Sequence, residues 1–147
     1  MFSGVSKSAH DLSIAVHYKD AAKLAKRYEK DVAAAWHPAN TTWEGIVTHE
    51  LGHALDDLLS NGLKVFGRIN GGRIKYASAA LRPKVMKACG LKVSDTASAV
   101  SRYATKDHFE WFAECFAEYM ESPDPRPVAL EFGKQLEEVM KGCGLMP

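Results

Sequence analysis

Two histidines and one glutamate stand at a spacing that suits a metal site. Residues 49–53 read His-Glu-Leu-Gly-His, an H-E-x-x-H motif. On a helix, residues four apart lie one above the other on the same face, so His49 and His53 could bind one ion together. Glu50 would lie beside a water on that ion and could accept its proton. The motif therefore predicts zinc-dependent hydrolysis, which uses two neutral nitrogen ligands, a third protein ligand and a carboxylate base.

The residues around the motif predict the helix that it needs. Thr41 and Thr42 can cap an N-terminus, and Glu44 stands three residues after Thr41, as a capping box requires. Asn61 and Gly62 have the residue types that end helices. Between them, apolar residues recur at helical spacing, namely Ile46, Val47, Leu51, Ala54, Leu55, Leu58 and Leu59. This context argues against an accidental match, which would arise roughly one or two times in a hundred.

The third ligand has to come from elsewhere in the chain. The acidic residues downstream of the motif include Asp56, Asp57, Glu110, Glu114 and Glu118. Asp56 and Asp57 belong to the motif helix itself and would point away from the ion or past it. The three glutamates share one stripe of a second predicted helix, residues 107–120, where Asp107 and Glu110 form another capping box. One of them as a ligand explains the stripe better than the alternative, a solvated helix face.

Two segments of the chain resemble a known family of zinc metallopeptidases. They are residues 49–57 and the run from Arg102-Tyr103 to Glu110-Trp-Phe-Ala-Glu114-Cys-Phe. Both are similar to the catalytic domain of the anthrax lethal factor family, which belongs to the gluzincins. The resemblance spans residues 49–120 and does not extend before Thr41. Members of this family cut particular protein targets, and such domains also occur in toxins and in phage-related proteins.

The resemblance implies a role for each matched residue. His49, His53 and Glu110 are the implied ligands of one zinc ion in a zincin-like domain. Glu50 is the implied general base. Tyr103 matches a tyrosine that lies over the metal and steadies the tetrahedral intermediate.

Glu114 and Asp57 are the candidates for outer partners of the zinc ligands. In this family a glutamate one turn after the ligand orients a zinc histidine, and Glu114 matches it. Ligand histidines usually donate their other N–H to a carboxylate or a carbonyl, which Asp57 could also accept. Two alternatives stay open: Glu114 is the ligand in place of Glu110, or Tyr103 is an ordinary half-buried tyrosine.

The chain as a whole predicts an α+β domain that is mainly helical. Its 147 residues suit a single domain over residues 1–147, which could itself be a segment of a longer polypeptide. Further helices are predicted at residues 20–36, 81–88 and 128–141, with Pro83 in the first turn of the second. Apolar and polar residues alternate over residues 12–18, which predicts a short strand of a small N-terminal sheet. Residues 64–76 indicate a hairpin or a loop, and residues 92–105 a connector.

Composition and charge argue against several classes of protein. The formal net charge of +1 is low for a nucleic-acid-binding protein, which normally carries a basic stripe. No apolar stretch reaches membrane-spanning length and no signal peptide is recognisable, so synthesis in the cytoplasm is expected. The three cysteines, Cys89, Cys115 and Cys143, are too far apart for a zinc knuckle or a disulfide framework. The other histidines are expected at the surface or in caps, and they are His10, His17, His37 and His108.

These features together predict a zinc endopeptidase. Its substrate would be a peptide in an extended conformation that pairs with an edge strand from the N-terminal half. One alternative is a zinc hydrolase of a small amide, similar to an amidase or a deformylase, with a closed pocket in place of a groove. The other is a binding module that holds zinc without turnover. The sequence specifies neither the protein target nor the oligomeric state.

Overall fold

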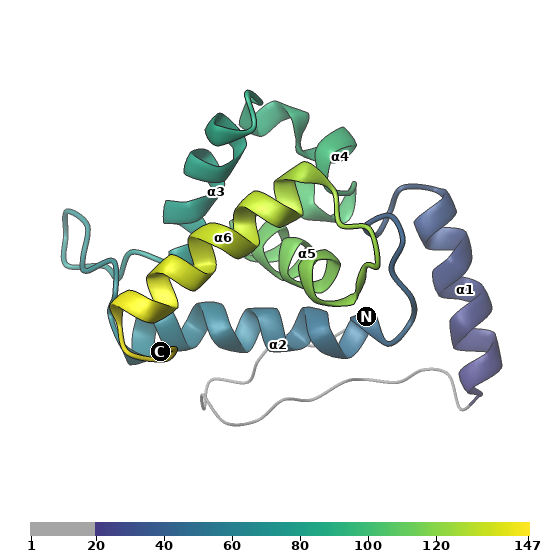
Figure 1. The fold of residues 1–147 in the computed structure, drawn as a ribbon, viewed down its shortest axis with the longest axis horizontal. Helices are drawn as coiled ribbons and strands as arrows, with labels where there is room; N and C mark the ends of the chain where they lie inside the picture. The colour runs from purple at the N-terminus through teal and green to yellow at the C-terminus, as the bar shows by residue number, and fades with distance from the viewer. Residues whose placement is uncertain (1–19) are drawn as a thin grey trace.

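The computed structural model describes residues 20–147 as an assembly of helices (Figure 1). The α-helices are α1 (Ala21–Ala33), α2 (Gly45–Asp57), α3 (Ala77–Ala88), α4 (Thr96–Ala99), α5 (His108–Glu121) and α6 (Pro127–Gly142). A π-helical turn (Leu58–Gly62) continues α2, and 3-10 turns lie at Val93–Asp95 and Tyr103–Thr105. The prediction of a mainly helical fold is confirmed. Residues 20–147 contain no strand, and the strand predicted at residues 12–18 lies outside the described part of the chain.

Helix α5 lies at the centre of the fold, where it contacts α2, α3 and α6 (Figure 1). Its Trp111 and Phe112 are fully buried and meet Phe132 of α6 edge-on, with ring centroids 5.6 and 4.9 Å apart. The capping box predicted for this helix is confirmed at its first half, because the Asp107 carboxylate accepts a hydrogen bond from the backbone N–H of Glu110 at 2.9 Å. The helix that carries Glu110 is thus anchored in the hydrophobic core.

Gly52, inside the motif, allows α2 and α5 to approach each other closely. A Cβ atom built on Gly52 would lie 2.9 Å from Cα of Ala113 and 3.2 Å from Cβ of Phe116. The nearer atom belongs to the backbone of α5, which cannot rotate out of the way as a side chain can. Because the motif histidines are on α2 and the glutamates are on α5, this contact sets the distance across which they meet.

Replacement of Gly52 by alanine is therefore expected to destabilise the fold by about 1–3 kcal/mol, the usual cost of an extra carbon atom in a packed interface. Chemical denaturation of the metal-free protein measures this change in the free energy of unfolding. Gly142→Ala is the matched control, since Gly142 is also helical and a Cβ there would meet no atom within 4 Å. Equal stability of Gly52→Ala and the unmodified chain would contradict this account of the contact.

The cap predicted at Thr41 is wrong. Helix α2 begins at Gly45, and the side chain of the preceding residue, Glu44, makes no capping hydrogen bond. Thr41 Oγ1 instead donates to the carbonyl of Pro38 at 2.7 Å and lies 3.1 Å from the hydroxyl of Tyr28. A partner from α1 takes the threonine hydroxyl, so Thr41 holds the turn between α1 and α2.

The predicted place of Pro83 in a first helical turn is also wrong, because α3 begins earlier, at Ala77. Two side chains from the end of α2 and the π-turn cap this earlier start. Asp56 accepts a hydrogen bond from the backbone N–H of Ser78 at 2.9 Å, and Ser60 Oγ accepts one from that of Ala77 at 2.9 Å. Such caps from a distant segment are not visible in local sequence patterns.

Three other predicted segments agree with the structure. The helix predicted at residues 20–36 corresponds to α1, which has Asp20 as its cap but ends earlier, at Ala33, and the one at 128–141 corresponds to α6. Residues 64–76 form a loop with a single isolated bridge, between Arg68 and Ile74.

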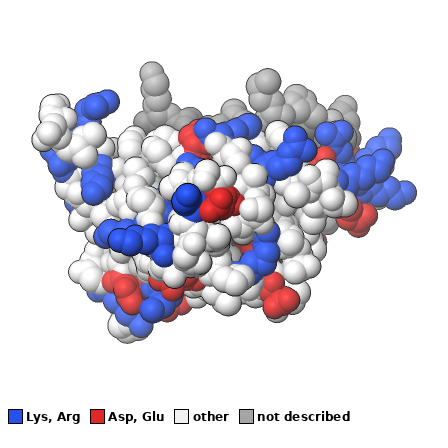
Figure 2. Space-filling view, turned by 90° about the horizontal axis from the view of Figure 1, so that it is seen from above, with Lys and Arg blue, Asp and Glu red and all other residues white. Residues whose placement is uncertain are grey.

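Among residues 20–147, no helix combines the length and the apolar character that a bilayer span requires. Figure 2 shows one face of the surface, where Lys and Arg side chains are scattered among uncharged residues and fewer Asp and Glu.

Candidate metal centre

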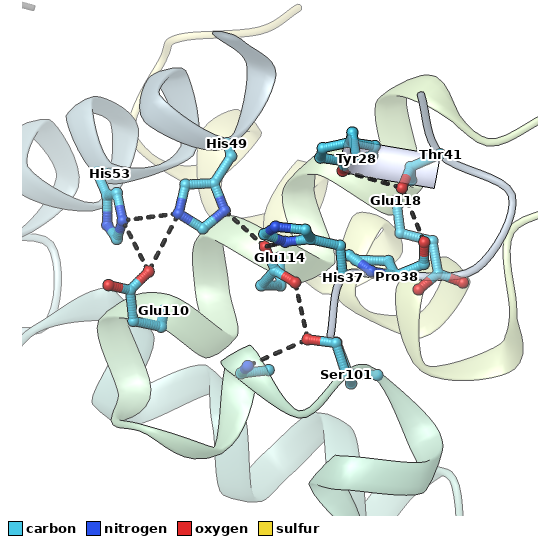
Figure 3. Close-up of polar contacts among 12 residues, drawn as sticks. Tyr28, His37, Pro38, Thr41, His49, His53, Ser101, Glu110, Glu114 and Glu118 are labelled. Carbon is cyan, nitrogen blue, oxygen red and sulfur yellow. Dashed lines mark hydrogen bonds and ion pairs between the residues drawn. The ribbon is translucent and has the colours of Figure 1, made fainter. Parts of the chain in front are cut away.

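Three of the predicted site residues meet in one cluster (Figure 3). Nε2 of His49 and Nε2 of His53 lie 3.1 Å apart, and Oε2 of Glu110 lies 3.1 Å from the first nitrogen and 3.2 Å from the second. The histidines come from successive turns of α2, and the glutamate comes from the first turn of α5. This group of three side chains could hold a metal ion.

The distances between the donors fit a small divalent cation. Bonds of about 2.0–2.1 Å from zinc to nitrogen and carboxylate oxygen place tetrahedral ligands about 3.3 Å apart. The observed edges of 3.1–3.2 Å are close to that value. Two imidazole nitrogens that face each other so closely cannot both carry a proton without repulsion, whereas one cation can accept both lone pairs. A tetrahedral ion held by these three donors would keep a fourth position for a water or a substrate.

The electrostatics of the cluster favour a bound positive charge. Burial by itself lowers the pKa of His49, but hydrogen bonds and negative charge from Glu110 and Glu114 outweigh it and raise the pKa to about 9. Burial by itself raises the pKa of Glu110, but hydrogen bonds to His49 and His53 outweigh it and hold the pKa far below the ordinary value. The carboxylates of Glu110 and Glu114 therefore stay ionised and attract a cation.

Glu114 contacts Nδ1 of His49, the ring nitrogen that does not face the other two donors. Its Oε1 lies 2.8 Å from Nδ1 of His49, a close approach that is not aligned as a hydrogen bond. Glu114 is 1 % exposed, and its polar contacts with the His37 and His49 rings, together with their positive charge, outweigh its burial and lower its pKa. The structure thus places Glu110 at the Nε2 atoms of the cluster and Glu114 at Nδ1 of His49.

Glu50 is buried beside the cluster, with 2 % of its surface exposed. Burial raises the pKa of this carboxyl, and the charge of Glu110 also raises it, whereas the charges of His49 and His53 lower it. Its Oε2 has no hydrogen-bond partner among the described residues. A buried carboxylate with one unpartnered oxygen could accept a proton from a water bound at the metal site.

Tyr103 lies over the first histidine, at the start of a 3-10 turn. Its ring centroid is 5.8 Å from that of His49, and the ammonium group of Lys106 lies 3.8 Å from its centre. Burial and the negative charge of Glu110 raise the pKa of the phenol, so the hydroxyl remains a hydrogen-bond donor near neutral pH. A neutral phenol beside the cluster could donate a hydrogen bond to negative charge that develops on a substrate there.

Other acidic candidates from the sequence have different partners. Asp57 accepts a hydrogen bond from Asn61 at 2.5 Å, and no contact joins it to a motif histidine among the described residues. Asp56 caps α3, as described above. Glu118 is bound by Arg126 through Nε at 2.8 Å and Nη2 at 2.7 Å, an ion pair that fixes the segment before α6. Of the glutamate stripe, only the first two members face the motif.

Two residues near the cluster were missed by the sequence patterns. His37, expected at the surface or in a cap, is only partly exposed and its Nδ1 lies 3.4 Å from Oε1 of Glu114. Ser101, in the predicted connector, is buried and donates a hydrogen bond to Oε2 of Glu114 at 2.7 Å. Neither has a spacing relative to the motif that could have revealed it. His108, in contrast, contacts Ser78 Oγ at 2.8 Å, and no contact joins it to the cluster among the described residues.

Comparison of the chain with protein-family models, with curated proteins and with solved structures gives no match, so its assignment depends on the residues and distances described above.

Proposed function

We propose that this chain is a zinc-dependent endopeptidase, with one zinc ion held by His49, His53 and Glu110. The observation that carries the proposal is the meeting of these three donors from two helices, with buried Glu50 beside them. Two imidazoles, one carboxylate and one open corner form the ligand set that is typical of catalytic zinc.

The residues around the donors supply the steps of peptide hydrolysis. When bound, zinc polarises the scissile carbonyl and lowers the pKa of a water in the open position. Glu50 accepts the proton of the attacking water and then returns it to the departing amine. Tyr103 donates a hydrogen bond to the carbonyl oxygen as negative charge grows on it, which lowers the barrier. Glu114 keeps the His49 ring oriented toward the ion.

The proposed substrate is a peptide in an extended conformation. The sequence predicted that it pairs with an edge strand from the N-terminal half, but residues 20–147 contain no strand that could serve. The pairing with an edge strand is therefore not part of the proposal for residues 20–147.

Metal analysis combined with a peptide library tests the proposed function. We expect zinc to bind in one equivalent per chain and the library to be cleaved, with cleavage lost after chelation and restored by zinc. Cleavage of small amides but of no peptide would instead favour the small-amide hydrolase. Zinc binding without turnover of either substrate would favour the binding module.

The change Tyr103→Phe is expected to lower kcat about 100-fold with little effect on KM. The removed hydroxyl would act on the carbonyl oxygen mainly in the transition state, and loss of one such donor has effects of about this size. Steady-state kinetics on a peptide found in the library measures both parameters.

Tyr76→Phe is the matched control for this variant. Tyr76 is also partly exposed, and its hydroxyl only accepts a 3.5 Å hydrogen bond from the exposed Asn61. The control is expected to leave kcat unchanged. A raised KM at constant kcat in Tyr103→Phe would instead assign Tyr103 to substrate binding.

A further inference from the structure

We infer that Ser101 and His37 are positioning residues, which hold the Glu114 carboxylate so that it orients His49 toward the metal ion. The inference rests on the metal site of the proposed function and adds to it two residues that the motif does not include. Both act through Glu114, and neither contacts the Nε2 atoms of His49 and His53 that would bind the ion. Their contacts involve segments far from the motif in the sequence.

Both oxygens of Glu114 are held, each by different partners (Figure 3). Oε1 faces Nδ1 of His49 at 2.8 Å and Nδ1 of His37 at 3.4 Å. Oε2 accepts a hydrogen bond from the hydroxyl of Ser101 at 2.7 Å. A carboxylate bound at one oxygen alone could rotate about its last bonds, whereas one bound at both oxygens keeps a single orientation. The orientation that results presents Oε1 to the histidine.

Ser101 also connects this carboxylate to the turn that carries Tyr103. Its Oγ accepts a hydrogen bond from the backbone N–H of Ala104 at 3.1 Å, within the 3-10 turn Tyr103–Thr105. The side chain is 1 % exposed, so water cannot easily replace either bond. One hydroxyl therefore fixes the metal side and the tyrosine side of the site relative to each other.

His37 is held in place by an aromatic stack. Its ring lies parallel to that of Tyr28, with the centroids 4.8 Å apart and 8° between the planes. The backbone around it joins the same turn, because Arg102 N–H donates to the carbonyl of Ala35 at 2.8 Å and Tyr103 N–H donates to that of Trp36 at 3.1 Å. The segment after α1 thus supports Glu114 and Tyr103 together.

The lengths of these contacts predict the order of their effects. The 2.7 Å bond from Ser101 lies in the normal range for a charge-assisted hydrogen bond, and the 3.4 Å contact from His37 lies outside it. Loss of Glu114 removes the whole arrangement. The zinc affinity should therefore fall most in Glu114→Ala, less in Ser101→Ala and least in variants of His37.

The decisive experiment is a double-mutant cycle on zinc affinity, measured by competition with a chromophoric chelator. We expect Glu114→Ala to weaken zinc binding about 10–100-fold, the usual effect of an outer partner of a ligand histidine. Ser101→Ala should weaken it about 3–10-fold, below that range, because Ser101 acts on the ligand histidine only through Glu114. In the double variant, Ser101→Ala should add no further loss, because its effect passes through the carboxylate that is already absent.

Ser98→Ala is the matched control for Ser101→Ala. Ser98 lies in the same connector, but it is exposed and donates only to the carbonyl of Asp95 at 3.0 Å. Denaturation of the metal-free proteins separates a general loss of stability from a loss of affinity. Equal zinc affinity of Ser101→Ala and Ser98→Ala would overturn the inference, and so would losses that multiply in the double variant.

Two replacements of His37 test the second residue independently of Ser101. His37→Phe keeps a ring to stack on Tyr28 and removes the N–H, whereas His37→Asn keeps a short donor and removes the stack. If the N–H holds Glu114, zinc affinity should fall about 2–5-fold in His37→Phe and recover in His37→Asn. Unchanged zinc affinity in His37→Phe, together with reduced affinity in His37→Asn, would assign His37 to packing and exclude it as a positioning residue.

The cycle distinguishes failure of this inference from failure of the metal site. If the unmodified chain binds no zinc, both the proposed function and the positioning roles are wrong. If it binds zinc and cleaves peptides while Ser101→Ala and His37→Phe retain full affinity, only the positioning roles are wrong.

Discussion

Replacement of Glu110 by alanine is expected to abolish binding of the metal ion. Its Oε2 forms two edges of the donor triangle, at 3.1 and 3.2 Å from the histidine nitrogens, and it is the sole anionic member of that triangle. Without it, two neutral imidazoles would have to hold a dication with water in the remaining positions. The affinity should fall by more than about 100-fold, beyond the range that outer partners of ligands produce.

Metal content after dialysis, together with chelator competition, measures this loss. Glu138→Ala is the control, since Glu138 is exposed on α6 and far from the motif in sequence. The comparison with Glu114→Ala decides the alternative that the sequence left open. Full occupancy in Glu110→Ala, combined with loss of the metal in Glu114→Ala, would exchange the two roles.

The change Glu50→Gln is expected to remove turnover while the metal stays bound. Glutamine has nearly the same shape as glutamate but cannot accept a proton, and general acid–base catalysis contributes about 10²–10⁴-fold to such reactions. The buried side chain does not belong to the donor triangle, so its replacement leaves the three donors in place. Peptide cleavage and zinc content, measured on the same preparation, test both halves of this expectation.

Glu44→Gln is the matched control, because Glu44 stands at the beginning of the same helix and is exposed. It should leave both cleavage and zinc content unchanged. Loss of zinc in Glu50→Gln would mean that Glu50 is a ligand or that it supports the fold. Retained cleavage would mean that another group accepts the proton.

Local patterns in the sequence were sufficient for the elements that carry the site. The spacing of His49 and His53 places them on one face of a helix in any fold, because the geometry of the α-helix relates residues four apart. The same rule placed Glu110 and Glu114 on one stripe of the second helix, and Asp107 marked where that helix begins. The predictions for these residues depended only on contacts between near neighbours in the chain.

Predictions that needed partners from elsewhere were less successful. Thr41 was predicted as a helix cap, but its hydroxyl is taken by Tyr28 and Pro38. The start of α3 depends on Asp56 and Ser60, which cap it from another element. In each case a local preference of modest strength was outweighed by a hydrogen bond with a residue distant in the sequence.

By itself the sequence determined which side chains could share a helix face and which chemistry they could perform together. Only the tertiary structure decided that Glu110 meets the two histidines, that Glu114 turns to the far side of His49, and that Glu118 is bound by Arg126. The physical reason is the packing of α2 against α5, which the absent side chain of Gly52 permits and which no periodicity encodes. The support that His37 and Ser101 give to Glu114 has the same origin, since it joins segments separated by 77 and 13 positions in the chain.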